Sequence, residues 1–384
     1  MNATAKLIPL GMDIAKNVFQ LYWVEPSTGE IKNIRVRRAK LLEHFANQPP
    51  VVVGMEACGG AQYWARELRK LGHEVRLLDG KEVKKFVTRN KSDAIDARAV
   101  WQAMQQSPAR FVPVKTELQQ AVLALHSMRR QLVKIRTMQI NALRGLLTEY
   151  GEVFGRGRKA LTQGLQAALE RVAMRLPQAV IDTLRLLWQR VGQLDQEVAQ
   201  IERSLRQMLA QDPLAQRFFE MPGVGLLGAT AFSASIADAQ SFRSGRNFSA
   251  WLGVVPRHTG SGGKNKLHGI SKRGDTYLRT LLIHGARSAV THTKHPNAWQ
   301  QGLLDRRPKN VAVVAVANKM ARTLWAIAAH GSRYDPNLAA SRAFLPVADM
   351  AEAASRRPRP RRSILAASRS QGSLRRASPA LDNV

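Results

Sequence analysis

Four carboxylates stand at positions where an acidic side chain needs an explanation. Asp13 lies inside a strand-like apolar run, where an acid is disfavoured. Glu56 follows the apolar run 51–55, and the ends of strands are where an α/β sheet presents side chains to a site. Asp93 and Asp96 are three residues apart in a helical stretch, so they share one helix face. We expect the four acids to meet in one partly buried site.

A site of this kind predicts divalent cations. Carboxylates brought together repel one another unless cations neutralise them, and ligands that are all oxygen favour Mg²⁺ or Mn²⁺. Two such ions about 4 Å apart can stabilise the attacking and the leaving oxygen of a phosphodiester. Simpler interpretations stay open for single residues: Ser92 or Asp93 caps the helix, and Glu56 is a solvated strand end.

A second candidate is Ser261, which lies in a segment rich in glycine and basic residues. Glycines on both sides of it let the backbone approach a phosphate closely. Residues 240–285 hold a single acid, Asp275, and eight bases that form a phosphate-binding surface by composition: Arg243, Arg246, Arg257, Lys264, Lys266, Lys272, Arg273 and Arg279.

The Ser261 hydroxyl needs activation before it is a good nucleophile. The options that the sequence offers as a base are His258, His268 and the distant carboxylates. The alternative interpretation is a flexible loop whose serine only hydrogen-bonds to backbone.

Upstream, Gly223 and Gly225 form a Gly-X-Gly turn after Met221 and Pro222. This pattern is typical of the hairpin in a helix-hairpin-helix element, whose free backbone N–H groups bind a phosphate. A plain turn between two helices is the alternative.

The overall composition favours a nucleic-acid partner. The 384 residues include 59 Lys and Arg against 28 Asp and Glu, a net charge of +31. The apolar stretch 311–329 is interrupted by Asn318, Lys319 and Arg322, so we expect a buried helix of a soluble protein and no membrane association. The single cysteine, Cys58, and the absence of a secretory pattern favour a reducing cytoplasm, where the protein would associate with the nucleoid.

The elements that must position these residues begin with a mixed α/β domain at residues 1–112. Strands are expected at 7–14, 18–24, 31–36, 51–55 and 74–78, with helices near 39–47 and 62–71. Three strands before the first helix predict antiparallel pairing, and the later strand-helix-strand order predicts parallel addition to the same sheet.

Beyond this domain the pattern is mainly helical. Apolar residues at helical spacing predict long helices over 116–150 and 179–209, joined around 151–157 as an antiparallel hairpin or coiled coil within residues 113–215. Contact within one chain and contact between subunits explain the apolar stripes equally well. A mainly α-helical C-terminal domain is expected at 216–335, followed by a disordered basic tail at 336–384.

The order of these motifs over residues 7–330 resembles the IS110/IS1111 family of insertion-sequence transposases, which are related to Piv-type DNA invertases. The matching segments are Gly11-Met12-Asp13 with Lys16, Met55-Glu56-Ala57, 90–97, 222–225 and 256–275. Where Ser-Ser-Gly-Gly is common in the family, this chain has Gly260-Ser261-Gly262-Gly263, which leaves Ser261 in register and Thr259 as a less favourable substitute.

The resemblance implies a RuvC/RNase H-like first domain whose DEDD tetrad is Asp13, Glu56, Asp93 and Asp96 and binds Mg²⁺ or Mn²⁺. It implies that Ser261 is the nucleophile that links the protein covalently to DNA. It also implies a structured non-coding guide RNA that pairs with donor and target DNA, and a homo-oligomer such as a dimer or tetramer. The predicted function is an RNA-guided DNA recombinase that conserves phosphodiester energy as a phosphoserine ester.

Two other functions compete with this prediction. One is a RuvC-like, metal-dependent junction endonuclease that cuts with water and leaves no protein on the DNA. The other is a non-catalytic nucleic-acid-binding protein whose acids are structural.

Overall fold

A computed structural model describes residues 7–87, 92–106, 111–261, 264–293 and 296–336. The predicted disordered tail lies outside these ranges, apart from its first residue.

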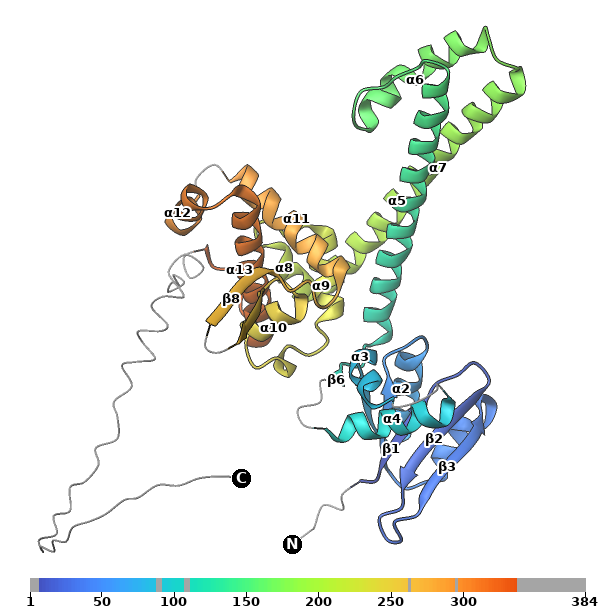
Figure 1. Ribbon diagram of the computed structural model, residues 1–384, viewed down its shortest axis with the longest axis vertical. Coiled ribbons are helices and arrows are strands. Elements are labelled where there is room, and N and C mark those ends of the chain that lie inside the picture. Colours follow the sequence, from blue (N-terminus) through green and yellow to red (C-terminus); the bar gives the residue numbers. More distant parts are fainter. Residues whose placement is uncertain (1–6, 88–91, 107–110, 262–263, 294–295, 337–384) are drawn as a thin grey trace, which may run out of the picture. The chain divides into compact units, whose positions relative to one another are not determined.

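The N-terminal part of the chain is built on a six-stranded mixed sheet (Figure 1). Its strands are β1 (Pro9–Asp13), β2 (Val18–Val24), β3 (Ile31–Arg37), β4 (Val52–Glu56), β5 (Glu74–Leu78) and β6 (Phe111–Val112). They lie in the order β3-β2-β1-β4-β5-β6. The first three pair antiparallel and β4 and β5 add parallel to β1, as the sequence predicted. The short antiparallel edge strand β6 was not predicted.

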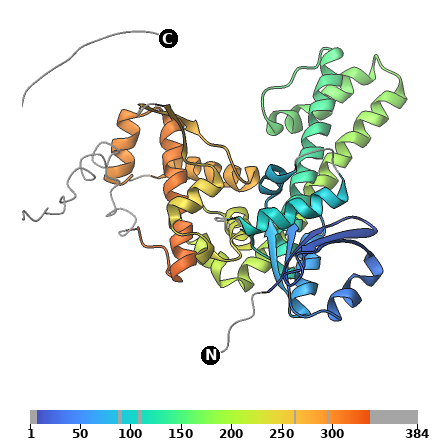
Figure 2. The same cartoon turned by 60° about the horizontal axis from the view of Figure 1, so that its bottom comes forward.

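Helices cover both faces of this sheet (Figure 2). One face packs against α1 (Leu41–Ala46), which follows the 3-10 turn η1 (Arg38–Lys40), and α2 (Ala61–Lys70). The other packs against α4 (Asp93–Gln105), with α3 (Gly80–Val83) and η2 (Lys84–Phe86) beside it. A mixed sheet between helical layers agrees with the α/β architecture expected for the first domain.

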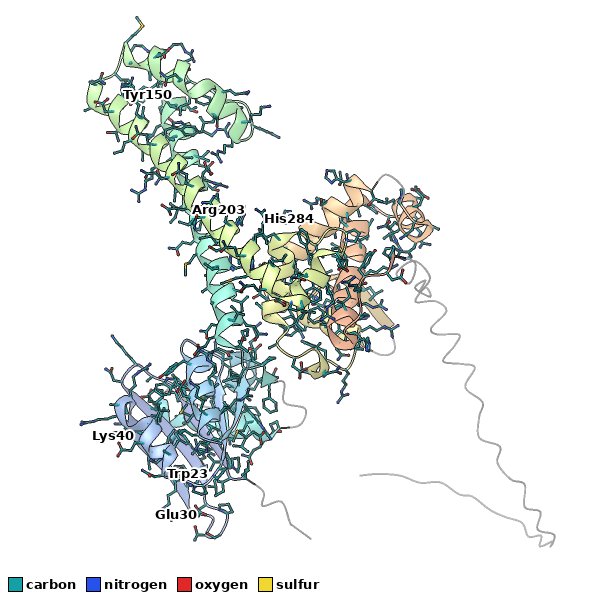
Figure 3. The ribbon with its side chains drawn as sticks, turned by 180° about the vertical axis from the view of Figure 1, so that it is seen from behind. Trp23, Glu30, Lys40, Tyr150, Arg203 and His284 are labelled. Atoms are coloured by element: carbon teal, nitrogen blue, oxygen red, sulfur yellow. The ribbon has the colours of Figure 1, made fainter. Side chains whose placement is uncertain are left out.

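Two long helices follow the sheet. They are α5 (Glu117–Glu149), which begins with a capping box at Thr116, and α7 (Gln178–Gln211). Ion pairs join Arg129 to Glu202 and Arg136 to Asp195. Residue numbers therefore increase along α5 in the direction in which they decrease along α7. The two helices are therefore antiparallel, as predicted; Figure 3 labels Tyr150, just past the end of α5, and Arg203 on α7.

The connection between these helices is not the simple glycine-containing loop that the sequence predicted. A separate helix, α6 (Arg158–Ala173), lies between them. Its buried face carries Leu161, Leu165 and Leu169, which pack with residues of α5 and α7 in one apolar cluster. The prediction was wrong because Gly151, Gly155 and Gly157 indicate a loop just before this helix, although the leucines that follow them have helical spacing.

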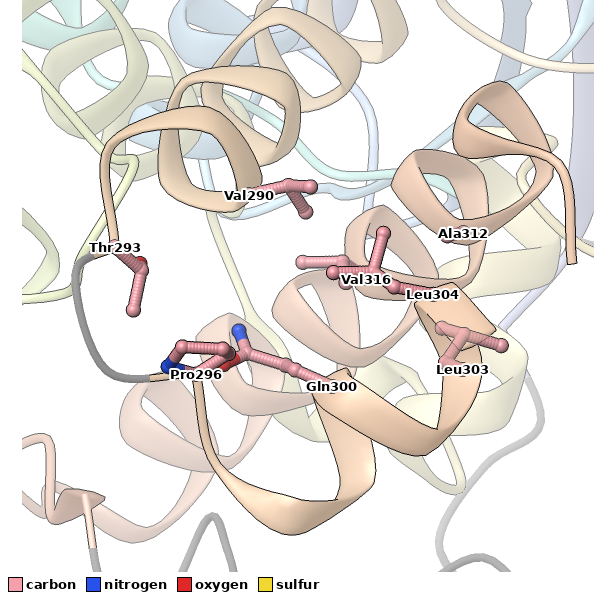
Figure 4. A pocket seen from close by; sticks show the side chains of 8 residues that line it. All are labelled: Val290, Thr293, Pro296, Gln300, Leu303, Leu304, Ala312 and Val316. Carbon is pink, nitrogen blue, oxygen red and sulfur yellow. The ribbon is translucent and has the colours of Figure 1, made fainter. Parts of the chain in front are cut away.

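The remaining helices surround a second large core. They are α8 (Pro213–Phe219), α9 (Leu226–Ser235), α10 (Gly245–Leu252), α11 (Thr276–His292), α12 (Ala298–Arg306) and α13 (Lys309–His330), with the 3-10 turn η3 (Ala239–Ser241). A small cavity between α11, α12 and α13 has a volume of about 10 Å³, room for one water at most (Figure 4). It is a packing defect of this core and is too small for a ligand.

Helix α13 is long and apolar enough to cross a membrane by length and composition alone. In the structure it is a core helix, since Val313, Ala317, Ala321 and Leu324 are buried in the C-terminal core. This agrees with the expectation of a buried soluble helix.

The segment around Ser261 forms a β-hairpin, which differs from the flexible loop given as the alternative interpretation of the sequence. Strand β7 (Pro256–Ser261) pairs antiparallel with β8 (Lys264–Ile270), with an irregularity in register near Arg257. Glycine and basic residues obscured the alternation from which a strand is normally predicted.

Candidate functional site

Asp13 and Glu56 end two neighbouring parallel strands. Strands β1 and β4 pair with Met12 opposite Met55, so the next residue of each strand is the acid. Both methionines are buried in the core beneath the sheet. Because strand residues alternate between faces, the two acids belong to the opposite face, which α4 covers.

Helix α4 runs antiparallel to β1 and brings Asp93 and Asp96 to the same end of the sheet. The indole Nε1 of Trp101 donates to the carbonyl oxygen of Pro9 at 3.0 Å, which places this part of the helix at the start of β1. A Cβ atom added to Gly11 would lie 2.3 Å from the carbonyl oxygen of Ala97. Going backward along the helix therefore means going forward along the strand.

The two elements have matching lengths from this contact onward. From Ala97 back to Asp93 the helix advances about 6 Å, and from Gly11 on to Asp13 the strand advances about 7 Å. The start of α4 thus lies level with the end of β1. The glycine is what permits this close approach, because any side chain at position 11 would meet the backbone of α4.

The environments of the four acids differ. Asp13, Glu56 and Asp96 are half-buried, and Asp93 is exposed. The helix cap is Ser92, whose hydroxyl accepts from the N–H of Ile95, so the interpretation of Asp93 as the cap is wrong.

Two contacts describe the surroundings of Glu56. A Cβ at Gly80 would lie 2.6 Å from its Oε1, so this glycine leaves room for the carboxylate. The thiol of Cys58 has its pKa raised by burial and then by the negative charges of Glu56 and Asp13. The charges of two of the four acids, Glu56 and Asp13, therefore act on the same neighbouring group.

The four acids suit a hard divalent cation by their chemistry, since all their donors are oxygen. Within the described ranges, however, no three His, Cys, Asp or Glu side chains come close enough together to hold a metal ion. The structure brings the elements that carry the acids to one end of the sheet, where β1 and β4 finish. It does not show the closed cluster of four carboxylates that the sequence predicted.

Ser261 is the last residue of β7 and pairs with Lys264 across the hairpin. The side chains of these two residues lie outside what the structure describes. The backbone register places position 259 opposite 266, and alternation places 259 and 261 on one face of the hairpin. Positions 266 and 268 belong to this same face, whereas position 258 belongs to the other.

One polar contact marks this face of the hairpin. The hydroxyl oxygen of Thr259 lies 2.5 Å from Nε2 of His268. Of the two histidines considered as a base for Ser261, His268 shares the face of Ser261 and His258 does not. Arg257 and Lys266 are exposed on the hairpin and remain available to phosphate.

The loop after the hairpin is held tightly against the end of α10. Lys272 adopts a left-handed conformation with φ of 54°. A Cβ at Gly253 would lie 1.9 Å from the carbonyl oxygen of Arg273, so backbone meets backbone here. The side chains of Lys272 and Arg273 are exposed and face solvent beside the hairpin.

Arg279 does not fit the phosphate-binding role predicted for it. Its side chain is buried, with a residue exposure of 8%, and its guanidinium donates to the carbonyl oxygens of Leu252 and Arg273. It is a structural residue that fastens α11 to the preceding loop. The sequence could not reveal this, because an arginine in a basic segment looks the same whether it is buried or exposed.

The predicted helix-hairpin-helix turn lies between α8 and α9. Gly223 has a φ of +84°, and a Cβ there would lie 2.5 Å from the carbonyl oxygen of Gly285 in α11. Gly225 precedes α9, and no side chain caps that helix. Gly223 is thus required for packing, while the exposed Gly225 stands at a helix N-terminus suited to an anion.

A buried polar network was missed by sequence reasoning. Nδ1 of His126 lies 2.8 Å from the hydroxyl of Tyr277, and its Nε2 lies 3.0 Å from the hydroxyl of Thr230. Burial, followed by the charge of Arg129, lowers the pKa of His126 to about 4. The network joins α5, α9 and α11, and no sequence signal announces it because its members are 104 and 151 residues apart.

Comparisons with known proteins identify the family. A family model described as "Transposase" matches residues 10–152, and one described as "Transposase IS116/IS110/IS902 family" matches residues 215–301. The chain belongs to the IS110/IS1111 family of transposases. Members of this family are enzymes that act on DNA. The matches confirm the family resemblance that the sequence motifs indicated.

Individual relatives are similar over most of their length. A "Probable family 20 transposase" of Pseudomonas aeruginosa is 44% identical over 85% of this chain and 98% of its own. The "Transposase for insertion sequence element IS1111A" of Coxiella burnetii is 40% identical over 85% and 90%. The "Transposase for insertion sequence element IS1328" of Yersinia enterocolitica is 36% identical over 84% and 97%.

Proposed function

We propose that this IS110/IS1111-family transposase cuts and rejoins DNA strands through a covalent phosphoserine intermediate at Ser261, assisted by the DEDD acids. One observation supports this most strongly: β1, β4 and α4 bring the four acids to the same end of the sheet. These acids are Asp13, Glu56, Asp93 and Asp96. If each acid had a separate structural role, the four would not need to lie at the same end of the sheet.

In this proposal the acids hold Mg²⁺ or Mn²⁺, which would neutralise charge on the phosphodiester when bound. Asp13 and Glu56 supply carboxylates from the rigid strand ends, and Asp93 and Asp96 supply them from the first turn of α4. The close contact at Gly11 sets the spacing between these two sources. The devices that position the acids are thus backbone contacts, which tolerate little movement.

The covalent step uses the hairpin. The Ser261 oxygen forms a bond to phosphorus, and the bond from phosphorus to the leaving deoxyribose oxygen breaks. The hydroxyl proton passes to a base, and the leaving oxygen takes up a proton to become a free hydroxyl. We assign the base to His268, since the hairpin register places it on the face of Ser261 and its Nε2 already engages the neighbouring Thr259 hydroxyl.

The ester conserves the energy of the broken bond, so rejoining needs no ATP. We further propose that a structured guide RNA selects donor and target by base pairing while the protein grips backbones, which the net charge of +31 suits. A homo-oligomer would allow the acids and Ser261 of different subunits to act on one phosphate. We propose that such a complex acts in the cytoplasm, bound to the nucleoid.

The test is capture of a protein–DNA adduct. The chain is expressed from a plasmid that carries its coding sequence with the natural flanking DNA, and protein is recovered under denaturing conditions so that only covalently attached DNA remains. We expect attached DNA with the wild type and with Thr259→Ala, and none with Ser261→Ala or Asp13→Asn.

The controls separate chemistry from folding and from the competing functions. Asp182→Asn changes an exposed acid on α7 and should leave the adduct intact. Nicked DNA without attached protein would instead indicate hydrolysis by water. Equal adduct with Ser261→Ala and wild type would refute the role of Ser261.

A further inference from the structure

The charged residues that interrupt α13 have no part in the function described so far. Lys319 and Arg322 lie one turn apart on this core helix, and Asn318 precedes them. A helix that otherwise packs with alanine, valine and leucine would be more stable with apolar residues at half-buried positions. The two cations at these half-buried positions therefore indicate a role other than core packing.

Lys319 is a desolvated cation. Its Nζ atom is buried, and within the part of the chain that the structure describes it has no hydrogen-bond partner. The ammonium lies 4.4 Å from the centre of the Trp299 ring of α12, which offsets part of the cost of burial. Burial, and then the charge of Arg322, lowers the pKa of Lys319.

Two arginines extend this charge toward the surface. Arg322 packs against the start of α10, where a Cβ at Gly245 would lie 3.1 Å from its Cα atom. Burial, and then the charge of Arg246, lowers the pKa of Arg322. Arg246 stands in the first turn of α10 and is exposed. The three cations thus form a series from the half-buried Lys319 to solvent.

Nothing among the described residues neutralises the two ends of this series. Neither Lys319 nor Arg246 forms a salt bridge with a carboxylate in the ranges that the structure covers. Like charges gathered in partly desolvated surroundings repel, and an anion bound among them relieves that repulsion. The N-terminus of α10 adds partial positive charge at the same place.

The position of the cluster relates it to the serine hairpin. The side-chain amide of Asn318 donates to the carbonyl oxygen of Val254 at 3.2 Å, two residues before β7 begins at Pro256. Lys319 and Arg322 are within about 6 Å along the helix axis of this anchor. The cations therefore lie near the base of the hairpin that carries Ser261.

We propose that Arg246, Lys319 and Arg322 form a binding site for a phosphodiester phosphate of a nucleic acid strand. The site holds the strand at the base of the β7–β8 hairpin, and this role rests on the proposed function of that hairpin. A phosphate bound there accepts from the exposed guanidinium of Arg246, and the charges of Arg322 and of the buried Lys319 ammonium add electrostatic attraction. It supplies the counter-charge that neither Lys319 nor Arg246 receives from a carboxylate of the described residues.

The experiment measures nucleic-acid affinity of the full chain over a series of salt concentrations. Lys319→Met keeps the length of the side chain and removes its charge. Lys309→Met is the matched control, because it removes one charge from the exposed start of the same helix. Duplex DNA, single-stranded DNA and RNA of equal length and sequence serve as separate probes.

We expect Lys319→Met to weaken binding of at least one probe about tenfold. The slope of log affinity against log salt should fall by about 0.9 for duplex DNA or about 0.7 for a single strand, the change expected when one cation that neutralises phosphate charge is removed. The probe that shows this change identifies the strand. The melting temperature should stay unchanged or rise, because an uncompensated desolvated cation has been removed.

Arg246→Gln provides a second variant without risk to folding, since this side chain is exposed, and it should lower the same slope. The proposal is overturned if Lys319→Met and Arg246→Gln bind all three probes with the affinity and slope of Lys309→Met. A lower melting temperature for Lys319→Met with unchanged binding would also overturn it and assign the lysine to folding. Neither result would touch adduct formation at Ser261, which is measured separately.

Discussion

Replacement of Gly11 by alanine tests how the acids are positioned. The added Cβ would lie 2.3 Å from the carbonyl oxygen of Ala97 and 2.6 Å from the backbone nitrogen of Trp101. Ordinary contact begins near 3.4 Å, so α4 has to withdraw from β1 by about 1 Å. Because Asp93 and Asp96 begin this helix, they withdraw with it.

The expected loss is large for activity and moderate for stability. A misplacement of about 1 Å at a reacting centre lowers the rate about 100-fold. Overpacking of a core contact reduces the free energy of unfolding by about 1–3 kcal/mol. We therefore expect Gly11→Ala to remain folded, to bind Mn²⁺ more weakly in calorimetric titration, and to yield about 100-fold less DNA adduct than the wild type.

Gly54→Ala is the matched control on the neighbouring strand. Its Cβ would meet Sδ of Met104 at 2.5 Å, and this atom is near the end of a flexible side chain that can move aside. The control should keep metal affinity and adduct yield close to the wild type. If Gly11→Ala kept both as well, while folded, the contact between α4 and β1 would not be what positions the acids.

Four further outcomes are expected. Lowering the pH from 7 to 4 should reduce the free energy of unfolding by about 3 kcal/mol through His126: its folded pKa of about 4 lies below the ordinary 6.5, so the unfolded chain binds more protons between these values and stability is lost as pH falls. Denaturant titrations of the wild type and His126→Gln check this, and an equal pH dependence in both would contradict it. Arg279→Met should lower stability by about 2 kcal/mol because buried carbonyls lose their donor, with the salt dependence of DNA binding unchanged. His268→Gln should slow adduct formation more than His258→Gln does, as followed in a time course, and the reverse order would favour His258 as the base. Chelation of divalent cations should abolish the adduct and restoration of Mn²⁺ should recover it; adduct in excess chelator would exclude a metal requirement.

The first domain was predictable in detail because its strands have strong local signals. Apolar runs such as 51–55 and 74–78 predicted strands whose observed bounds differ by a residue or less. The pairing pattern followed from the order of strands and helices along the chain. Among the described strands of this domain only the two-residue β6 was missed, and the short helix α3 was missed as well, since two to four residues carry no periodicity.

The parts that escaped prediction depend on contacts between distant segments. The short helix α6 was hidden between two long helices, although Leu161 and Leu165 already have helical spacing. The burial of Arg279 and of His126 is decided by elements that pack from elsewhere in the chain. Sequence patterns report which face of an element is apolar, and they do not report which polar groups that face will enclose.

For the candidate site, the sequence predicted the residues and the structure added the arrangement of the elements that carry them. The spacing of Asp93 and Asp96 predicted a shared helix face, but the antiparallel direction of α4 on β1 could be learned only from the contacts at Pro9 and Gly11. Likewise the glycines around Ser261 indicated a close approach of backbone, while the hairpin register revealed which histidine shares its face.

The most direct test of the central claim is mass spectrometry of the adduct. Trypsin cleavage after Arg257 and Lys264 releases a peptide in which Thr259 and Ser261 are the two hydroxyl residues. After digestion of the attached DNA by a nuclease, fragmentation of this peptide locates the remaining nucleotide. We predict that the nucleotide is on Ser261. A nucleotide on Thr259, on a residue outside this peptide, or on no residue of the cleaving enzyme would contradict it.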